Sequence, residues 1–411
     1  MTSCRQSGIR CIRRARGHRI RRTARRRTST RQLPGKKLKC SYDSCLQIKV
    51  LRASGLHYGQ DLFYLCQRQI QARYPLIDRA NREDAMATIH EHFSGLFIPH
   101  VTPFESSGAL DLESLTRLTQ HLSSLPGVAG LVSCARIGES SVLSIEEKRR
   151  VYEVSGKAVH DAGKVHIATI APQSTDEAIS LMRDLESLPV DGVMIFPPLL
   201  FAWGKVDPNL KVRFFEDLAR ETKLPIVLFQ VPVKSYYYDP ETVCRIARLE
   251  NVLAFKEASF DINLFTETIQ ALKRDKAAMR VLTGNDRFVA ESYKLGANGA
   301  LIGVANVATE KWGAMDIAGR AGKFDEAAAI QHELELVKEL VFSEPIVEAV
   351  ARIKVVLQHD GLIKTAKVRR PQLGISEAEQ KQLLDSYRVL KRNEFRSAET
   401  GAESKRRQAV A

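Results

Sequence analysis

Eight short runs of apolar residues recur along the chain from Gly95 onward, and they limit the possible folds more than any other feature of the sequence. The apolar residues within a run are mostly consecutive, which is typical of strands that are buried on both faces, as in a parallel sheet. The runs are Gly95–Val101, Val128–Cys134, Val165–Ile170, Gly192–Phe196, Ile226–Val231, Val252–Glu257, Arg280–Thr283 and Gly299–Val304. We therefore expect a parallel sheet of eight strands.

The segments between the runs carry the signals of helix starts. Ser144 and Glu147 have the spacing of a capping box, and Asp239 before Pro240 fits an N-cap followed by proline at the first helical position. Strand and helix therefore alternate eight times, which predicts a (β/α)8 barrel. An open doubly wound sheet is expected to have a glycine-rich phosphate turn after its first strand, and no such turn follows the first run.

The distribution of charge divides the chain. Residues 1–85 contain 21 Lys and Arg against 5 Asp and Glu, a net charge of +16, whereas residues 86–411 contain 41 against 43, a net charge of −2. We expect residues 1–85 to be a basic, disordered leader, because apolar residues are too sparse there for a packed helix face. Residues 86–307 are expected to form the barrel, residues 308–390 an extension of helices only, and residues 391–411 a charged tail.

The basic leader has three interpretations. It fits an arginine-rich transit peptide, a basic arm for nucleic acid, or translated sequence upstream of a native start at Met86. We favour the third, because charge balance and periodicity become those of a globular domain at Met86. In addition, neither interleaved aromatic residues nor metal-ligand spacing accompany the arginines. Nucleic acid is therefore not an expected partner.

Two further features limit the class of protein to which the chain can belong. The longest apolar run, Val193–Trp203, has 11 residues with two prolines, well short of the roughly 20 that a membrane-spanning helix needs. Beyond the leader only Cys134 and Cys244 occur, which are too few for a disulfide framework and indicate a reducing compartment. We therefore expect a cytoplasmic protein without a membrane segment.

A lysine stands at the end of the sixth run, where barrel enzymes carry their chemistry. Alternation turns Lys256 and the small Ala254 to one side of the strand and Leu253 and Phe255 to the other, so Lys256 is expected to point into the barrel. An ammonium group in an apolar barrel mouth loses solvation and its pKa falls, which frees an amine that condenses with ketones, as in class I aldolases. Alternatively, Lys256 only extends to the rim or pairs with Glu257. The residues alone leave both interpretations open.

Six short motifs together resemble one family of enzymes. They are TPF at 102–104, GES at 138–140, VP at 231–232, FKEAS at 255–259, LTGND at 282–286 and RPQL at 370–373. Their order and spacing are similar to those of the dihydrodipicolinate synthase and N-acetylneuraminate lyase family, over nearly all of the chain beyond the leader. The resemblance implies a (β/α)8 barrel with C-terminal helices, in homo-oligomers that are usually tetramers. It also implies that pyruvate or another 2-keto acid is bound as a Schiff base on Lys256, without a metal or other cofactor.

Six positions depart from the pattern of that family, and two of them are Leu199 and Leu200, which replace its tyrosines after the fourth strand. Phe229 stands where members usually have a tyrosine that acts as general acid and base, and phenylalanine cannot transfer a proton. Arg136 and Ile137 replace a pair of hydroxyl residues that hold the carboxylate of the keto acid. Lys234 aligns with an arginine that holds the second substrate. The chain therefore resembles a member that has diverged at the catalytic tyrosine.

Other groups are candidates for the lost contacts. Arg136 is suited to clamp a carboxylate, with a solvated loop arginine as the alternative, and the backbone amides of Gly138 and Glu139 are candidates for a carboxylate cradle. The resemblance places Leu301 beside the keto acid, with plain barrel core as the alternative. For proton transfer the sequence offers Tyr236–Tyr238, a water molecule or the substrate's own carboxylate.

Two functional hypotheses follow. The first is a lyase that forms a Schiff base between Lys256 and a 2-keto acid, and performs aldol condensation with an aldehyde, cleavage or dehydration. The second is a catalytically impaired barrel that binds a keto acid or sugar acid as a sensor or structural partner. The intact Lys256 favours the enzyme.

Overall fold

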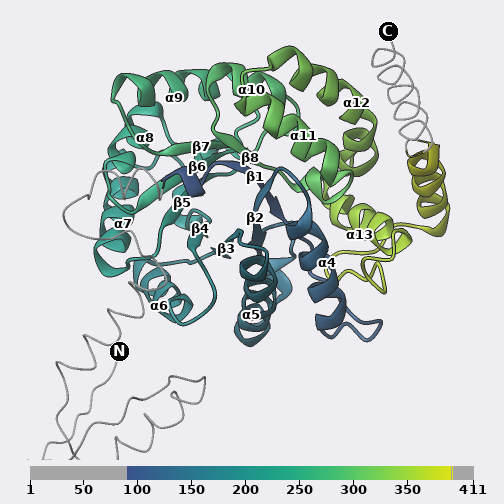
Figure 1. Cartoon of the computed structure of the whole chain (residues 1–411). Helices are drawn as coiled ribbons and strands as arrows, with labels where there is room; N and C mark the ends of the chain where they lie inside the picture. The colour runs from purple at the N-terminus through teal and green to yellow at the C-terminus, as the bar shows by residue number, and fades with distance from the viewer. Residues whose placement is uncertain (1–89, 390, 392–411) are drawn as a thin grey trace, which may run out of the picture. The chain divides into compact units, whose positions relative to one another are not determined.

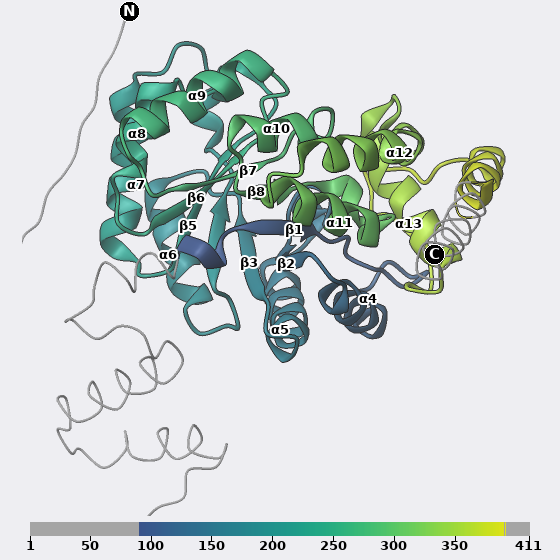
Figure 2. The same ribbon diagram turned by 45° about the horizontal axis from the view of Figure 1, so that its top comes forward.

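The computed structural model describes residues 90–389 and residue 391, so the basic leader and almost all of the charged tail lie outside the described residues. The described chain forms a closed barrel of eight parallel strands in the order of the sequence, with helices around it (Figure 1). Figure 2, turned by 45°, shows the same strands inside the layer of helices. The predicted (β/α)8 barrel is confirmed.

Each strand lies within one of the eight predicted runs, and one helix follows each strand. The strands are β1 (Gly95–Pro99), β2 (Val128–Ser133), β3 (Val165–Ile170), β4 (Gly192–Ile195), β5 (Ile226–Gln230), β6 (Val252–Glu257), β7 (Arg280–Thr283) and β8 (Gly299–Leu301). The helices are α4 (Leu112–Ser124), α5 (Ile145–Asp161), α6 (Thr175–Leu185), α7 (Pro208–Glu221), α8 (Pro240–Ala247), α9 (Ile262–Arg274), α10 (Val289–Leu295) and α11 (Thr309–Arg320).

Side-chain caps fix where several helices begin. Ser144 accepts a hydrogen bond from the Glu147 amide, and the Glu147 carboxylate accepts one from the Ser144 amide, so the predicted capping box is present at α5. At α8 the Asp239 side chain accepts from the Thr242 amide, and Pro240 occupies the first turn. Each cap stabilises its helix by about 1 kcal/mol and sets the end of the loop before it.

Two apolar cores hold the barrel together. The larger, outer core packs the strands against the helices, and the inner core fills the ring of strands. The inner core includes Phe97, Val132, Ile167, Met194, Val227, Phe229, Leu282 and Leu301. Because Phe229 and Leu301 also line the cavity at the barrel mouth, the packed interior forms part of the wall of that cavity.

The sixth strand departs from the expected alternation. Its pairing with β5 shifts in register between Ile226 and Val227, which leaves Leu253 as an additional residue on β6. Leu253 and Ala254 both pack into the inner core, so the predicted outward orientation of Leu253 is wrong. Beyond this bulge Lys256 lines the cavity at the mouth of the barrel, as the alternation from Ala254 predicts.

The chain after the barrel is helical only in part. It contains α12 (Phe324–Phe342), the short helix η6 (Ile346–Glu348), α13 (Ala349–His359) and a helix over residues 377–389. Residues 360–376 form no helix, whereas the sequence predicts helices only in residues 308–390. Gly361, with a φ of 74°, ends the preceding helix, and Pro371 lacks the amide hydrogen that a further helix would need.

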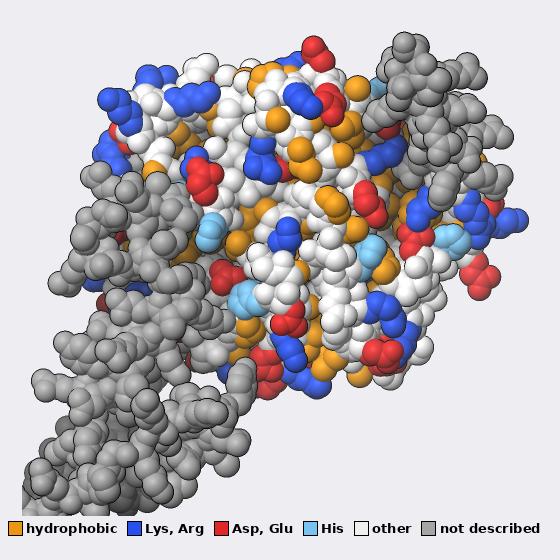
Figure 3. All heavy atoms as spheres, in the orientation of Figure 1, with side chains coloured by type: hydrophobic (Ala, Val, Ile, Leu, Met, Phe, Trp, Pro, Cys, Tyr) orange, Lys and Arg blue, Asp and Glu red, His pale blue; other side chains and the backbone are white. Residues whose placement is uncertain are grey.

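Basic and acidic side chains are interspersed over the face shown in Figure 3, and the described residues present no continuous basic surface on that face. Within the described part of the chain, no helix combines the length and the apolar character needed to cross a bilayer.

Candidate active site

A cavity of about 360 Å³ opens at the C-terminal ends of the strands, where barrel enzymes place their chemistry. Five of the eight site residues predicted from the sequence line it. They are Arg136, Ile137, Phe229, Lys256 and Leu301. The other three, Gly138, Glu139 and Lys234, do not line this cavity.

Lys256 extends from β6 into the cavity, and its side chain is half-buried. Its nitrogen lies 4.2 Å from the centre of the Phe229 ring and forms no ion pair with any other described residue. Burial lowers the pKa of Lys256 to about 7; the negative charge of Asp286 opposes this shift, and the positive charge of Arg136 adds to it. A substantial fraction of the side chain is therefore a neutral amine near neutral pH.

Glu257, the alternative partner of Lys256, is engaged elsewhere. Its carboxylate accepts hydrogen bonds from the side chain of Gln230 (2.7 Å), the backbone amide of Ser259 (3.1 Å) and the side chain of Asn285 (2.7 Å). Alternation along β6 turns these two neighbouring side chains to opposite faces of the strand. The proposed pair between Lys256 and Glu257 is therefore not formed.

Gly284 follows the last residue of β7 and makes room for the lysine side chain. A Cβ atom at Gly284 would lie 3.1 Å from Cε of Lys256 and 2.7 Å from Cβ of Ala258. The chain therefore approaches β6 so closely that only glycine fits without displacement. This contact confines the stem of Lys256 on one side of its path into the cavity.

Phe229 gives the cavity an apolar wall beside the amine. Its ring packs edge to face against Phe196, with ring centres 4.9 Å apart and an angle of 73° between the ring planes. Neither ring carries a group that transfers protons. The wall therefore contributes to the desolvation that lowers the pKa of Lys256, but it takes no part in acid or base chemistry.

Asp286 is a cavity residue that the sequence patterns did not single out. The residue is only 8% exposed, and its Oδ1 has no hydrogen-bond partner among the described residues. Burial raises the pKa of Asp286 to about 6, while the positive charges of Lys256 and Arg136 lower it. The sequence did contain a signal for Asp286, because the LTGND motif places this carboxylate just after the seventh run, at the reactive end of the predicted barrel.

In the loop after β2, two backbone amides form hydrogen bonds within the loop itself. The Gly138 amide donates to the Ala135 carbonyl (3.0 Å), and the Glu139 amide donates to the Arg136 carbonyl (3.1 Å). Both amide hydrogens are thus used within the turn, so the carboxylate cradle expected from them is not available. The Glu139 carboxylate forms a buried ion pair with Lys354 of α13, so it has a structural partner away from the cavity.

Comparison with known proteins identifies the family of this chain. The profile of the Dihydrodipicolinate synthetase family matches residues 92–388, which is well over half of the chain. The chain belongs to this family. It is a family of class I aldolase-type lyases.

Named relatives support the assignment to the dihydrodipicolinate synthetase family. The 4-hydroxy-tetrahydrodipicolinate synthase of Moorella thermoacetica is 35% identical over 286 residues, which are 69% of this chain and 93% of that relative. The enzyme of the same name from Haloarcula marismortui is 32% identical over 262 residues, 62% of this chain and 83% of that relative. The solved dihydrodipicolinate synthase of Thermotoga maritima has 26% identity and a TM-score of 0.66, covering 72% of this chain and 98% of that structure.

The three tyrosines after β5 have different surroundings in this family member. Tyr236 lines the cavity. The Tyr237 hydroxyl donates to the Ser259 carbonyl (2.6 Å), and Tyr238 is buried in the outer core. Of the three tyrosines offered by the sequence for proton transfer, Tyr236 is the one that reaches the cavity.

A wider vestibule of about 810 Å³ extends the site of this family member outward. Arg136 and Asp286 line both spaces, and Arg287 and Lys338 add positive charge to the vestibule, next to two glutamates. Lys234 is exposed in the short helix η4 (Lys234–Tyr236) and lines neither space. The positive charge near the cavity therefore comes from Arg136, Arg287 and Lys338. It does not come from Lys234, the residue that the resemblance indicates.

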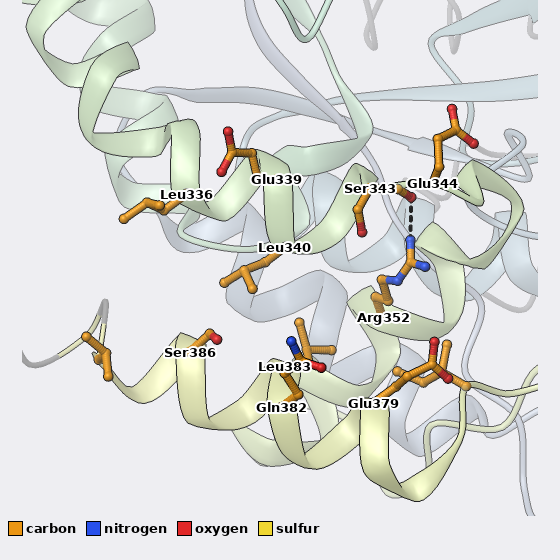
Figure 4. A pocket seen from close by; sticks show the side chains of 12 residues that line it. Leu336, Glu339, Leu340, Ser343, Glu344, Arg352, Glu379, Gln382, Leu383 and Ser386 are labelled. Carbon is orange, nitrogen blue, oxygen red and sulfur yellow. Dashed lines mark hydrogen bonds between the residues drawn. The ribbon is translucent and has the colours of Figure 1, made fainter.

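A separate cavity of about 560 Å³ lies between α12 and the helix over residues 377–389 (Figure 4). Leu340 and Leu383 face each other across it, and Arg352 donates a hydrogen bond of 2.6 Å to the Ser343 carbonyl. The described residues that line this cavity include no lysine, cysteine or histidine. It therefore lacks a nucleophile for imine chemistry, and the barrel mouth stays the candidate active site.

Proposed function

We propose that Lys256 forms a Schiff base with pyruvate or a related 2-keto acid, and that the enzyme joins, cleaves or dehydrates its substrate through this intermediate. The observation that carries the proposal is the half-buried amine, which has no ion-pair partner among the described residues and extends into the cavity at the barrel mouth. Its pKa of about 7 leaves enough neutral amine to attack a carbonyl group. The relatives named 4-hydroxy-tetrahydrodipicolinate synthase support a reaction of the aldolase type.

The first step is attack of the neutral amine on the C2 carbonyl carbon. The carbonyl oxygen takes up a proton from solvent, and the resulting protonated carbinolamine loses water to give an iminium ion. The positive charge of the iminium withdraws electrons from the neighbouring C3–H bond and so activates C3. The apolar wall of Phe229 and Phe196 limits access of water to the intermediate and so slows its hydrolysis.

Arg136 is the group that we assign to the carboxylate of the keto acid. It lines the cavity together with Lys256, and no ion pair with another described residue occupies its guanidinium group. A guanidinium pairs with a carboxylate through two parallel hydrogen bonds, which would fix the keto acid with C2 toward the amine. Ile137 and Leu301 line the same cavity and would contact the carbon chain of the substrate.

We further propose that the enzyme works without a metal or resident cofactor, as a homo-oligomer in the cytoplasm. The family resemblance supports the first two points, and the small number of cysteines beyond the leader supports the third. The small-molecule partners are the 2-keto acid and, in a condensation or cleavage, an aldehyde.

One observation favours the second hypothesis, a barrel that binds a keto acid or sugar acid without turnover. Phe229 presents an apolar ring to the amine where the resemblance predicts a tyrosine hydroxyl. A keto acid bound as an imine would then lack that proton carrier. This hypothesis predicts imine formation without consumption of any aldehyde or release of any cleavage product.

Borohydride reduction in the presence of pyruvate tests the proposal. Reduction of the imine leaves a carboxyethyl group on the lysine, and peptide mass analysis is expected to find this increment on the peptide that contains Lys256. The matched variant Lys256→Met is expected to show no increment. Lys354 serves as an internal control, because burial also lowers its pKa, to about 8, but it is paired with Glu139 and does not line the cavity. An unmodified Lys256 peptide across a panel of 2-keto acids would contradict the proposal.

A further inference from the structure

The cavity contains a carboxylate that the imine chemistry described above leaves without a role. Asp286 follows β7 and lines the cavity together with Lys256. Gly284, two residues earlier, packs so closely that a Cβ atom there would lie 3.1 Å from Cε of Lys256. The carboxylate is therefore held near the amine, at the same end of two neighbouring strands.

The segment that carries Asp286 is fixed by the residue before it. The Asn285 side chain donates to the Glu257 carboxylate (2.7 Å) and accepts from the Phe260 amide (2.7 Å). Asn285 thus ties the end of β7 to the end of β6. Asp286 differs, because its buried Oδ1 has no hydrogen-bond partner among the described residues. A buried carboxylate oxygen without a partner is costly, and it is expected to face a ligand.

We propose that Asp286 is the general base and acid of this enzyme, which removes a proton from C3 of the imine-bound keto acid and later donates it to the second substrate. The inference rests on the Schiff base at Lys256 proposed above. It assigns to Asp286 the proton transfer that Phe229 is unable to perform.

The step balances without any further reactant. The C3–H bond breaks, its proton goes to the Asp286 carboxylate, and its electron pair forms a double bond between C2 and C3. The π electrons of the C=N bond return to nitrogen, so the cationic iminium becomes a neutral enamine. The C2=C3 electrons then form a bond from C3 to the carbonyl carbon of an aldehyde, the nitrogen lone pair restores the iminium, and the aldehyde oxygen takes the proton from Asp286. Water finally hydrolyses the iminium, which releases the product and regenerates the amine of Lys256. Cleavage follows the same steps in reverse.

Other groups of the described site fit this role less well. The Tyr237 hydroxyl is used by the Ser259 carbonyl, and Tyr238 lies in the outer core. Tyr236 lines the cavity and is the remaining alternative for the general base and acid. With a pKa of about 6, Asp286 is mostly ionised at and above neutral pH and is able to accept a proton. The same pKa is close enough to neutral pH for the protonated carboxyl group to return that proton.

Exchange of the C3 protons of pyruvate in D2O, followed by NMR on the full chain, reports the proposed step separately from imine formation. Asp286→Asn keeps the size of the side chain and removes its charge. We expect exchange to fall by about 100-fold or more. Borohydride trapping at Lys256 is expected to stay at or above the level of the unsubstituted chain, because the charge of Asp286 raises the pKa of the amine and its loss lowers it. A merely structural role would reduce both readouts together.

Tyr236→Phe is the comparison variant. Asp286→Asn is expected to lose at least about tenfold more exchange than Tyr236→Phe. The opposite order would overturn the proposal, as would undiminished exchange in Asp286→Asn or an unsubstituted chain that traps pyruvate without exchanging C3. Failure of the unsubstituted chain to trap any keto acid is a different result, which removes the Schiff base at Lys256 and this inference with it.

Discussion

At the scale of single residues, three influences set the pKa of Lys256. Burial lowers it to about 7, Asp286 raises it, and Arg136 lowers it. Burial is the largest, because the ammonium group loses water and finds no ion-pair partner among the described residues in exchange. The Phe229 ring, 4.2 Å from the nitrogen, favours the cation by only about 1 kcal/mol, which does not replace the lost hydration.

We predict that Lys256→Met stabilises the fold, most strongly at and below pH 7. The unfolded lysine has an ordinary pKa of 10.5, so between pH 7 and 10.5 the unfolded state binds more protons than the folded state. The stability of the unsubstituted chain therefore rises with pH through this window. At pH 7, the lower end of the window, methionine removes a penalty of roughly 4 kcal/mol. Urea unfolding of both proteins at several pH values measures the difference. A methionine variant that is less stable at neutral pH would contradict a lowered pKa.

At the scale of secondary-structure elements, the ends of β6 and β7 determine where the reactive groups stand. The bulge at Leu253 changes the register of β6 against β5 before the strand reaches Lys256. The close approach at Gly284 confines the lysine stem, and Asn285 joins the ends of the two strands. Together these features bring Asp286 into the same cavity as the amine.

Gly284→Ala is expected to displace Lys256 and to reduce borohydride trapping with pyruvate several-fold. The new methyl group would lie 2.7 Å from Cβ of Ala258 and 3.1 Å from Cε of Lys256, and such overpacking costs about 1–3 kcal/mol of stability. Gly374→Ala is the matched control, because a Cβ atom there meets nothing within 4 Å. Equal trapping in the two variants would show that the contact at Gly284 does not position the lysine.

At the scale of the whole described chain, the C-terminal extension is joined to the loop that lines the cavity. Lys354 of α13 pairs with Glu139, and the two side chains are 0% and 1% exposed. Lys354 also donates to the Lys367 carbonyl (2.8 Å), and the Glu139 carboxylate accepts from the Arg369 amide (3.0 Å). The same loop carries Arg136, so the extension supports the residue that we assign to the substrate carboxylate.

Glu139→Gln is expected to destabilise the fold by about 3–5 kcal/mol, because it leaves the charge of Lys354 buried without its partner. Adding Lys354→Met removes that charge, so the double variant is expected to regain a large part of the loss. Thermal and urea unfolding of the two single variants and the double variant measure the coupling. Strictly additive losses would mean that the ion pair does not join the extension to the barrel loop.

The sequence by itself determined the eight strands, the helix caps, the family motifs and the placement of Lys256 at a strand end, because periodicity and spacing are properties of residues near one another in the chain. Tertiary structure decided which of the polar candidates share the cavity, because Arg136 lines it whereas Glu139 and Lys234 do not. It brought Asp286 beside the amine, and it joined Glu139 to Lys354, 215 residues away. Burial and charge pairing depend on atoms from distant segments, and these long-range contacts set the pKa values on which the proposed chemistry depends.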